Sequence, residues 1–348
     1  MTMGAGTFSG KPIRRVEDPD LLRGAGTYVD NLKIDGMLTL YFVRSPIAHA
    51  TIRSIDVKAA REMPGVVGVY SADDLDFPNA PALMALHPAA IRPSLAKGRV
   101  NFVGDPVVVV VAESRALAMD AAELVEIDYE PLGAVIDMED ALVPASPLQF
   151  ESMGSNVFIG LRAGSRDPLG GADVVVRGRF ENQRVAVVPM EGSAIAVDPT
   201  GPDFELTVHL SCQMPHMIRG VLAGLLGLDP AGVRVIAPNV GGAFGAKHLS
   251  AEGVVAAKLA LELRRPLKWV ETRSENMVAM PHGRGQVQYV ELGLKRDGTF
   301  TGMRCRMIGD AGGYGGFGGI LVLGQTKVIV ESLLDFYDRL VEELAFES

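Results

Sequence analysis

The stretch that decides the fold is GDPVVVVVAESRALAMDAAEL, residues 104–124. Its first three residues are a turn signal, and the β-branched run 107–111 is long enough for a strand buried on both faces. Ser114 can cap a following helix, in which apolar residues recur at i, i+4 and i+7 from Leu117. A buried strand followed directly by an amphipathic helix predicts a mixed α/β fold.

Strand patterns also precede this stretch. Residues 37–57 alternate polar and apolar side chains on both sides of a proline turn, which predicts two strands, and residues 66–70 predict a third. We therefore expect an N-terminal arm at 1–19 and a mixed α/β domain at 20–143.

A second region follows a segment without clear periodicity. Residues 144–172 are rich in Pro, Ser and Gly, which predicts a linker or extended arm before a larger α/β domain at 173–327. Residues 328–348 change to an acidic, amphipathic pattern that predicts a helical tail. The predicted strands of the larger domain are 174–180, 194–197, 204–210, 233–237, a short strand through Trp269, 287–294 and 300–307, and its predicted helices are 216–226 and 251–263.

Composition excludes several classes of function. The 348 residues carry a net charge of -9 with no Lys/Arg run longer than two, which argues against nucleic acid as a partner. No apolar run approaches the roughly 20 residues that span a bilayer, and residues 1–10 do not form a secretory signal, so we expect no membrane span and a cytoplasmic location. Cys212 and Cys305 are the only cysteines, so this chain alone builds neither a disulfide framework nor an iron–sulfur cluster.

A glycine-rich stretch, residues 240–247, lies between a predicted strand and a predicted helix. In that position backbone N–H groups can approach a phosphate closely. The stretch is not a Walker A loop, because neither neighbour of Lys247 fits that motif, and Val240 stands where a dinucleotide fingerprint needs glycine. A tight turn that packs a helix on a sheet explains the residues equally well.

Gln213 stands at the end of another predicted strand, just before a helix. Its neutral amide offers a donor and an acceptor at the mouth of a sheet, which suits a hydrogen bond to a cofactor oxo group or to substrate. A helix-capping role is the alternative. The six histidines show no metal-ligand spacing, so direct ligation of a metal by the protein is weakly supported.

These two elements belong to an ordered series of motifs. Together the motifs resemble the molybdenum-binding large subunit of the xanthine dehydrogenase, aldehyde oxidase and aerobic carbon monoxide dehydrogenase family. Each motif is weak alone, but their order and number are specific, and they extend from Gly10 to about Gly324. The motifs lie at 10–18, 22–24, 27–30, 44–50, 103–107, 181–183, 189–191, 213–216, 241–247, 266–269 and 282–284.

The resemblance implies an α/β hammerhead domain followed by the first, incomplete molybdopterin-binding domain. It implies cofactor-site roles for Gln213, Gly241, Gly242, Phe244 and Gly245. The cofactor would be a molybdopterin-type molybdenum cofactor, in the cytosine dinucleotide form typical of bacterial large subunits. Because the pterin dithiolene holds the metal, no residue of this chain need ligate it directly.

The resemblance also implies a reaction and partners. The family hydroxylates an aldehyde or heterocycle, or oxidises carbon monoxide, with water as the oxygen source and a glutamate as base. Electrons pass to an iron–sulfur small subunit and an FAD medium subunit, so this chain would carry neither Fe–S nor FAD.

The family's glutamate base is not found in this sequence. It lies near the end of longer family chains, and the candidates here stand outside its glycine-rich context, so we assign no catalytic residue to this chain. We therefore expect a second chain to complete the site. A split subunit, a truncation and a frameshift all remain open, and the alternative function is a noncatalytic fragment acting at most as an interaction module. The candidates considered are Glu331, Glu342, Glu343 and Glu347.

Overall fold

The computed structural model describes residues 10–82, 87–160, 162–163, 167–315 and 344–347. Apart from the predicted tail, the predicted strands and helices within these residues agree with the observed ones to within two residues at either end. No helix in this described part is long and apolar enough to cross a membrane.

A seven-stranded sheet forms the centre of the molecule, in the order β11-β10-β9-β12-β1-β5-β3. Strand β1 pairs in parallel with β12, with Leu38 opposite Leu267, so strands from both predicted domains build one sheet. Local periodicity does not predict this pairing, because the two strands are distant in sequence. The strands are β1 (Leu38–Arg44), β3 (Val66–Ser71), β5 (Pro106–Ala112), β9 (Ala194–Asp198), β10 (Leu206–Leu210), β11 (Val233–Ile236) and β12 (Leu267–Val270).

Strand β5 explains why its sequence is apolar throughout. Val109 and Val111 join the core cluster on one face of the sheet, while Val108 and Val110 join the cluster on the other face. Because both faces are covered, no position of this strand needs a polar residue, as the sequence predicts.

Helices and a small sheet cover the two faces. Helices α4 (Pro215–Leu226) and α5 (Ala251–Leu263) contribute to the first cluster, and α3 (Arg115–Ala122) contributes to the second. The predicted cap is confirmed, since Ser114 Oγ accepts from Leu117 N. The remaining helices are α1 (Asp18–Leu22), α2 (Lys58–Glu62) and α6 (Arg273–Ala279), and the small sheet has the order β4-β2-β6, with β2 (Ala50–Asp56), β4 (Arg99–Val100) and β6 (Glu126–Pro131).

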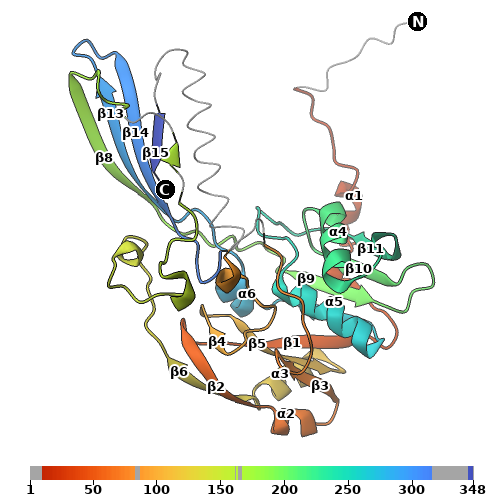
Figure 1. Cartoon of the computed structure of the whole chain (residues 1–348). Helices are drawn as coiled ribbons and strands as arrows, with labels where there is room; N and C mark the ends of the chain where they lie inside the picture. The colour runs from red at the N-terminus through yellow and green to blue at the C-terminus, as the bar shows by residue number, and fades with distance from the viewer. Residues whose placement is uncertain (1–9, 83–86, 161, 164–166, 316–343, 348) are drawn as a thin grey trace, which may run out of the picture.

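A five-stranded sheet, in the order β7-β15-β14-β13-β8, extends away from the rest of the molecule (Figure 1). Its hairpin of β13 and β14 confirms the hairpin predicted at Asp297-Gly298. Within its described residues, the predicted linker contributes one 3-10 turn, Glu151–Met153, and the short strand β7 to regular structure. The strands are β7 (Arg162–Ala163), β8 (Val174–Asn182), β13 (Gln286–Leu294), β14 (Phe300–Gly309) and β15 (Leu344–Glu347).

The predicted helical tail at 328–348 lies mostly outside the described residues. For Leu344–Glu347 the prediction is wrong, because these residues form strand β15. They pair in parallel with β14, with Met303 opposite Leu344. Backbone pairing with a neighbouring strand therefore decides the conformation of these four residues.

Candidate functional site

The fold brings the two predicted site elements to one edge of the central sheet. Gln213 follows strand β10, and the glycine-rich loop 241–247 follows strand β11. These strands are neighbours and run parallel, with Leu206 opposite Val233. The carboxyl ends of parallel strands meet at the same sheet edge, which is where ligands bind in many α/β proteins.

Gln213 contacts the loop directly. Gly245 N donates to Gln213 Oε1 at 3.0 Å, and Gln213 N donates to the backbone oxygen of Lys247 at 3.1 Å. The capping alternative for Gln213 is wrong, because the N-cap of helix α4 is Met214 and no side chain caps that helix end. The Gln213 side chain instead orients the loop.

The loop backbone is unusual at three positions. Gly242 and Gly245 have φ angles of 95° and 91°, and Phe244 has a φ of 51° although it is not glycine. The Phe244 side chain is 76% exposed. A non-glycine residue in the left-handed region costs on the order of 1 kcal/mol, and such strain concentrates at functional sites. A simple packing turn does not account for a strained aromatic residue that faces solvent.

An ion pair between Glu191 and Lys247 holds the glycine-rich loop in place. Glu191 Oε2 accepts hydrogen bonds from Gly241 N at 2.7 Å, Ser211 Oγ at 2.7 Å and Lys247 Nζ at 2.8 Å. The Lys247 side chain is fully buried, and its Nζ also donates to Ser211 Oγ at 2.8 Å. The pair therefore joins the first and last residues of the loop to the strand end that carries Gln213.

Sequence reasoning assigned no role to this ion pair. Lys247 closed the glycine motif and Glu191 stood in the motif at 189–191, but nothing in the spacing linked them. A lysine at the end of an otherwise apolar glycine loop was the available signal, since a buried ammonium needs a counter-charge. Glu191 Oε1 is also buried, and it has no hydrogen-bond partner among the described residues.

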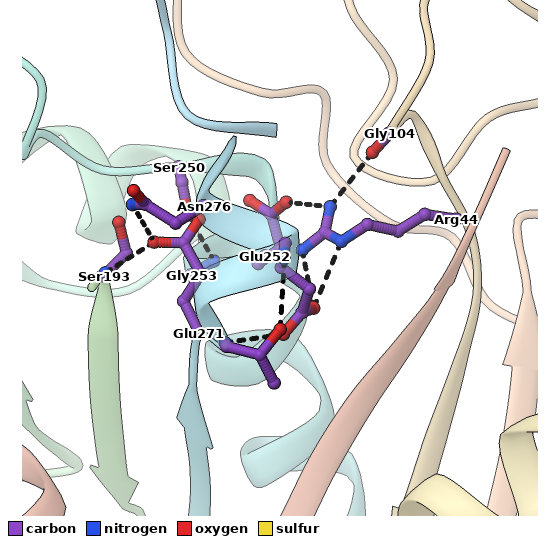
Figure 2. Close-up of polar contacts among 10 residues, drawn as sticks. Arg44, Gly104, Ser193, Ser250, Glu252, Gly253, Glu271 and Asn276 are labelled. Atoms are coloured by element: carbon purple, nitrogen blue, oxygen red, sulfur yellow. Dashed lines mark hydrogen bonds and ion pairs between the residues drawn. The ribbon is translucent and has the colours of Figure 1, made fainter. Parts of the chain in front are cut away.

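A second buried cluster links strand β1 of the N-terminal region to helices α5 and α6 (Figure 2). Arg44, at the end of β1, contacts Glu252 of α5 at 2.7 Å and Glu275 of α6 at 3.0 Å. Its Nη1 also donates to the backbone oxygen of Gly104 at 3.1 Å. Helix α5 begins shortly after the glycine-rich loop, so this cluster fixes the element that carries the loop.

The charges of this cluster stabilise one another. Burial lowers the pKa of Arg44, but Glu252 and Glu275 outweigh burial and raise that pKa above its usual range. Burial likewise raises the pKa of Glu252, but the cations of Arg44 and Arg92 dominate and hold it at about 2. Arg44 and Glu252 are therefore both charged at neutral pH.

Glu271 anchors the chain on the other side of the loop. Its Oε2 accepts from Ser193 N at 2.7 Å and from Asn276 Nδ2 at 2.8 Å (Figure 2). A Cβ on Gly192 would lie 3.0 Å from the Glu271 backbone oxygen, so glycine permits this close approach. Glu271 therefore holds the segment that presents Glu191.

Two cavities among the described residues lie elsewhere, and neither is lined by Gln213 or by the loop. One, of about 590 Å³, lies on the arginine-rich face of β8, β13 and β14. The other, of about 400 Å³, lies where the same strands meet the N-terminal region. The face made by Gln213 and Phe244 is exposed in this chain.

The fold is that of a molybdopterin-binding class of proteins. A model of the molybdopterin cofactor-binding domain matches residues 152–333, which is just over half of the chain. A model of the aldehyde oxidase and xanthine dehydrogenase a/b hammerhead domain matches residues 23–133. The chain therefore belongs to the molybdopterin-binding family of aldehyde oxidases, xanthine dehydrogenases and carbon monoxide dehydrogenase large subunits, as the sequence motifs predict.

Individual relatives agree with this assignment. The chain is 38% identical to the nicotine 6-hydroxylase large subunit of Paenarthrobacter nicotinovorans, over 88% of this chain and 38% of that protein. It is 36% identical to the carbon monoxide dehydrogenase large chain of Afipia carboxidovorans, over 86% of this chain and 39% of that one. The solved carbon monoxide dehydrogenase from Oligotropha carboxidovorans matches with a TM-score of 0.78 and 35% identity, over 86% of this chain and 39% of that chain. The chain thus spans about two fifths of the length of the relatives it matches.

Proposed function

We propose that this chain forms the molybdenum-cofactor-binding part of a molybdenum hydroxylase large subunit. The observation that carries the proposal is the hydrogen bond from Gly245 N to Gln213 Oε1, at 3.0 Å. It joins an amide side chain to a strained glycine loop at the carboxyl edge of a parallel strand pair. Family membership supports the same role.

The residues present fit such a cofactor. Because Gln213 Oε1 accepts from the loop, the amide nitrogen is the group left to donate to an oxo ligand or to substrate. At Gly242, where φ is 95°, an added Cβ would lie 2.9 Å from the Phe244 ring, so glycine suits this position of the loop. The neutral amide of Gln213 and the exposed backbone of the loop suit a molybdopterin cofactor, because the pterin itself holds the metal.

When bound, the cofactor would supply two-electron oxidation of a substrate carbon with oxygen from water. The chain's own residues would hold that group in place. Gln213 would orient it through one donated hydrogen bond, and the Glu191–Lys247 pair would keep the loop from moving. We propose the cytosine dinucleotide form of the cofactor, and an aldehyde, a heterocycle or carbon monoxide as substrate.

We further propose that residues outside this sequence complete the active site. No glutamate of this chain is assigned as base, so the base would come from a further part of the large subunit, on a second chain or on a continuation of this one. An iron–sulfur subunit and an FAD subunit would take the electrons. The alternative, a noncatalytic interaction module, predicts the same fold and assembly without bound molybdenum.

Metal analysis tests this proposal. The chain would be purified with its neighbouring subunits from a host that makes the cofactor, and molybdenum and acid-released cytidine nucleotide would be measured per chain. We expect both to be present. Gln213→Glu keeps the acceptor for Gly245 N but removes the amide donor, so it should retain several-fold less molybdenum. The control is Gln183→Glu, at an exposed glutamine after β8, which should leave molybdenum unchanged.

Two results would decide against the proposal. Wild-type complex without molybdenum would favour the noncatalytic module. Equal molybdenum retention in Gln213→Glu and Gln183→Glu would remove Gln213 from the site.

A further inference from the structure

The cavity of about 400 Å³ lies at the base of the projecting sheet and is built from four parts of the chain. Arg92 and Phe102 come from the N-terminal region, Arg184 follows strand β8, residues 277–283 follow helix α6, and residues 310–314 follow strand β14. Cavities that bind small molecules have volumes of about 300 to 1,000 Å³. This cavity is therefore large enough for a small ligand.

Arg92 presents unused hydrogen-bond donors at this cavity. Its Nε and Nη2 atoms are buried, and neither has a hydrogen-bond partner among the described residues. These two nitrogens form one edge of the guanidinium, the fork that binds both oxygens of a carboxylate. The Phe102 ring lies 5.0 Å from the guanidinium carbon and holds the fork by a cation–π contact.

The nearby carboxylates are engaged elsewhere. Asp310 lines the cavity but accepts from Arg184 Nε at 2.8 Å. Asp105 accepts from Asn101 N at 3.1 Å, and burial raises its pKa to about 6 despite the Arg92 cation. Neither carboxylate hydrogen-bonds the Arg92 fork. Glu252, whose pKa the Arg92 cation helps to lower, accepts from Arg44 instead. A buried guanidinium edge without a hydrogen-bonded anion is costly, so this edge is available to an anion from outside.

His282 adds an acceptor to the same cavity. Its Nε2 is buried and has no hydrogen-bond partner among the described residues. The ring hydrogen-bonds the backbone of Met277, and burial followed by the Arg184 cation lowers the pKa of the imidazole, so the ring is neutral at pH 7. With the ring proton on Nδ1 and directed at that carbonyl, Nε2 carries a lone pair that can accept a hydrogen bond from a ligand.

We propose that this cavity binds a small planar carboxylate. The carboxylate would contact the Arg92 fork, a donor group of the ligand would contact His282 Nε2, and the apolar body would lie against Phe102 and Tyr314. A carboxylate is preferred to phosphate, because the two parallel N–H groups of one guanidinium edge match two coplanar oxygens and the cavity walls include aromatic rings. This site shares no residue with Gln213 or the glycine-rich loop, so its test does not depend on the proposed cofactor.

Calorimetry on the full chain, without added cofactor, tests this site at pH 7. Benzoate and its neutral isostere benzamide are the paired probes, and inorganic phosphate is the third. We expect benzoate to bind and benzamide to bind at least tenfold more weakly. Arg92→Lys keeps the charge but removes the fork, so it should weaken benzoate binding about tenfold. Arg53→Lys, at an exposed pair with Glu130, is the control and should leave binding unchanged.

A second readout separates binding from folding. Circular dichroism should show the same spectrum and melting curve for Arg92→Lys and Arg53→Lys without ligand, and benzoate should raise the melting temperature of the Arg53→Lys protein more. Four results would each overturn the proposal: no benzoate binding at millimolar concentration, equal binding of benzoate and benzamide, tighter binding of phosphate than of benzoate, or full benzoate affinity in Arg92→Lys.

Discussion

Replacing Arg44 with methionine removes the cation at the centre of the buried cluster that joins the hammerhead region to helices α5 and α6. The side chains of Arg44, Glu252 and Glu275 are 8%, 5% and 5% exposed. The substitution keeps a long apolar side chain in place, so the main change is electrostatic. Two carboxylates are left buried without their shared partner.

The size of the effect follows from the pKa of Glu252. The pairing lowers that pKa from 4.5 to about 2, and a difference of that size corresponds to about 3 kcal/mol of stability at neutral pH. Breaking a buried ion pair costs about 3 to 5 kcal/mol by mutation, which agrees. We therefore expect Arg44→Met to lower the free energy of unfolding by about 3 kcal/mol or more at pH 7.

The pH dependence supplies a second test. Because the folded pKa of Glu252 lies below its ordinary value of 4.5, its contribution is complete above about pH 4.5 and is lost as pH falls through about 2. Without Arg44, burial raises the pKa of Glu252, so acid should stabilise the variant relative to wild type. The difference in the free energy of unfolding between wild type and Arg44→Met should therefore become smaller as pH falls from 7 to 4.

Urea unfolding followed by circular dichroism measures both effects. Arg53→Met, which breaks an exposed ion pair, is the matched control and should change stability little. Adding Glu252→Gln and Glu275→Gln to Arg44→Met should recover much of the loss, since no unpaired charge remains. Two results would refute the reasoning. One is a loss in the free energy of unfolding below about 1 kcal/mol for Arg44→Met, and the other is a difference from wild type that increases in acid.

Three further substitutions probe other features of the molecule. Lys247→Met should destabilise by about 3 kcal/mol in urea, because Glu191 keeps its neutral donors but loses its buried counter-charge; an unchanged midpoint would show that the ion pair is dispensable. Gly241→Ala should cost about 1 to 3 kcal/mol, because the new Cβ would lie 2.6 Å from Glu191 Cβ, and thermal melting measures this loss. Asp105 has a folded pKa of about 6, above its ordinary 3.8, so its titration alone should lower wild-type stability by about 2 kcal/mol as pH rises from 4 to 7. Asp105→Asn should flatten that slope, and a slope that persists in unfolding curves would assign the titration to another group.

Local structure could be predicted from the sequence because its signals are local. The valine run of β5, the cap at Ser114 and the turn at Asp297-Gly298 each depend on neighbours within a few residues. The proximity of Gln213 to Gly245 was also predictable in outline, since motifs at the ends of successive parallel strands fall on one sheet edge. The four residues of β15 were mispredicted, because pairing with a distant strand determines their structure.

The sequence by itself determined the order of strands and helices, the glycine loop with its glutamine, and the family to which the chain belongs. Only the tertiary structure decided which charged side chains form ion pairs. Arg44 and Glu275 are 231 positions apart, and Glu191 and Lys247 are 56 apart. Helical and strand periodicity reports which face of an element is buried, but partners at such separations depend on the path of the whole chain. The same holds for Arg92 and His282, whose shared cavity exists only where the projecting sheet meets the N-terminal region.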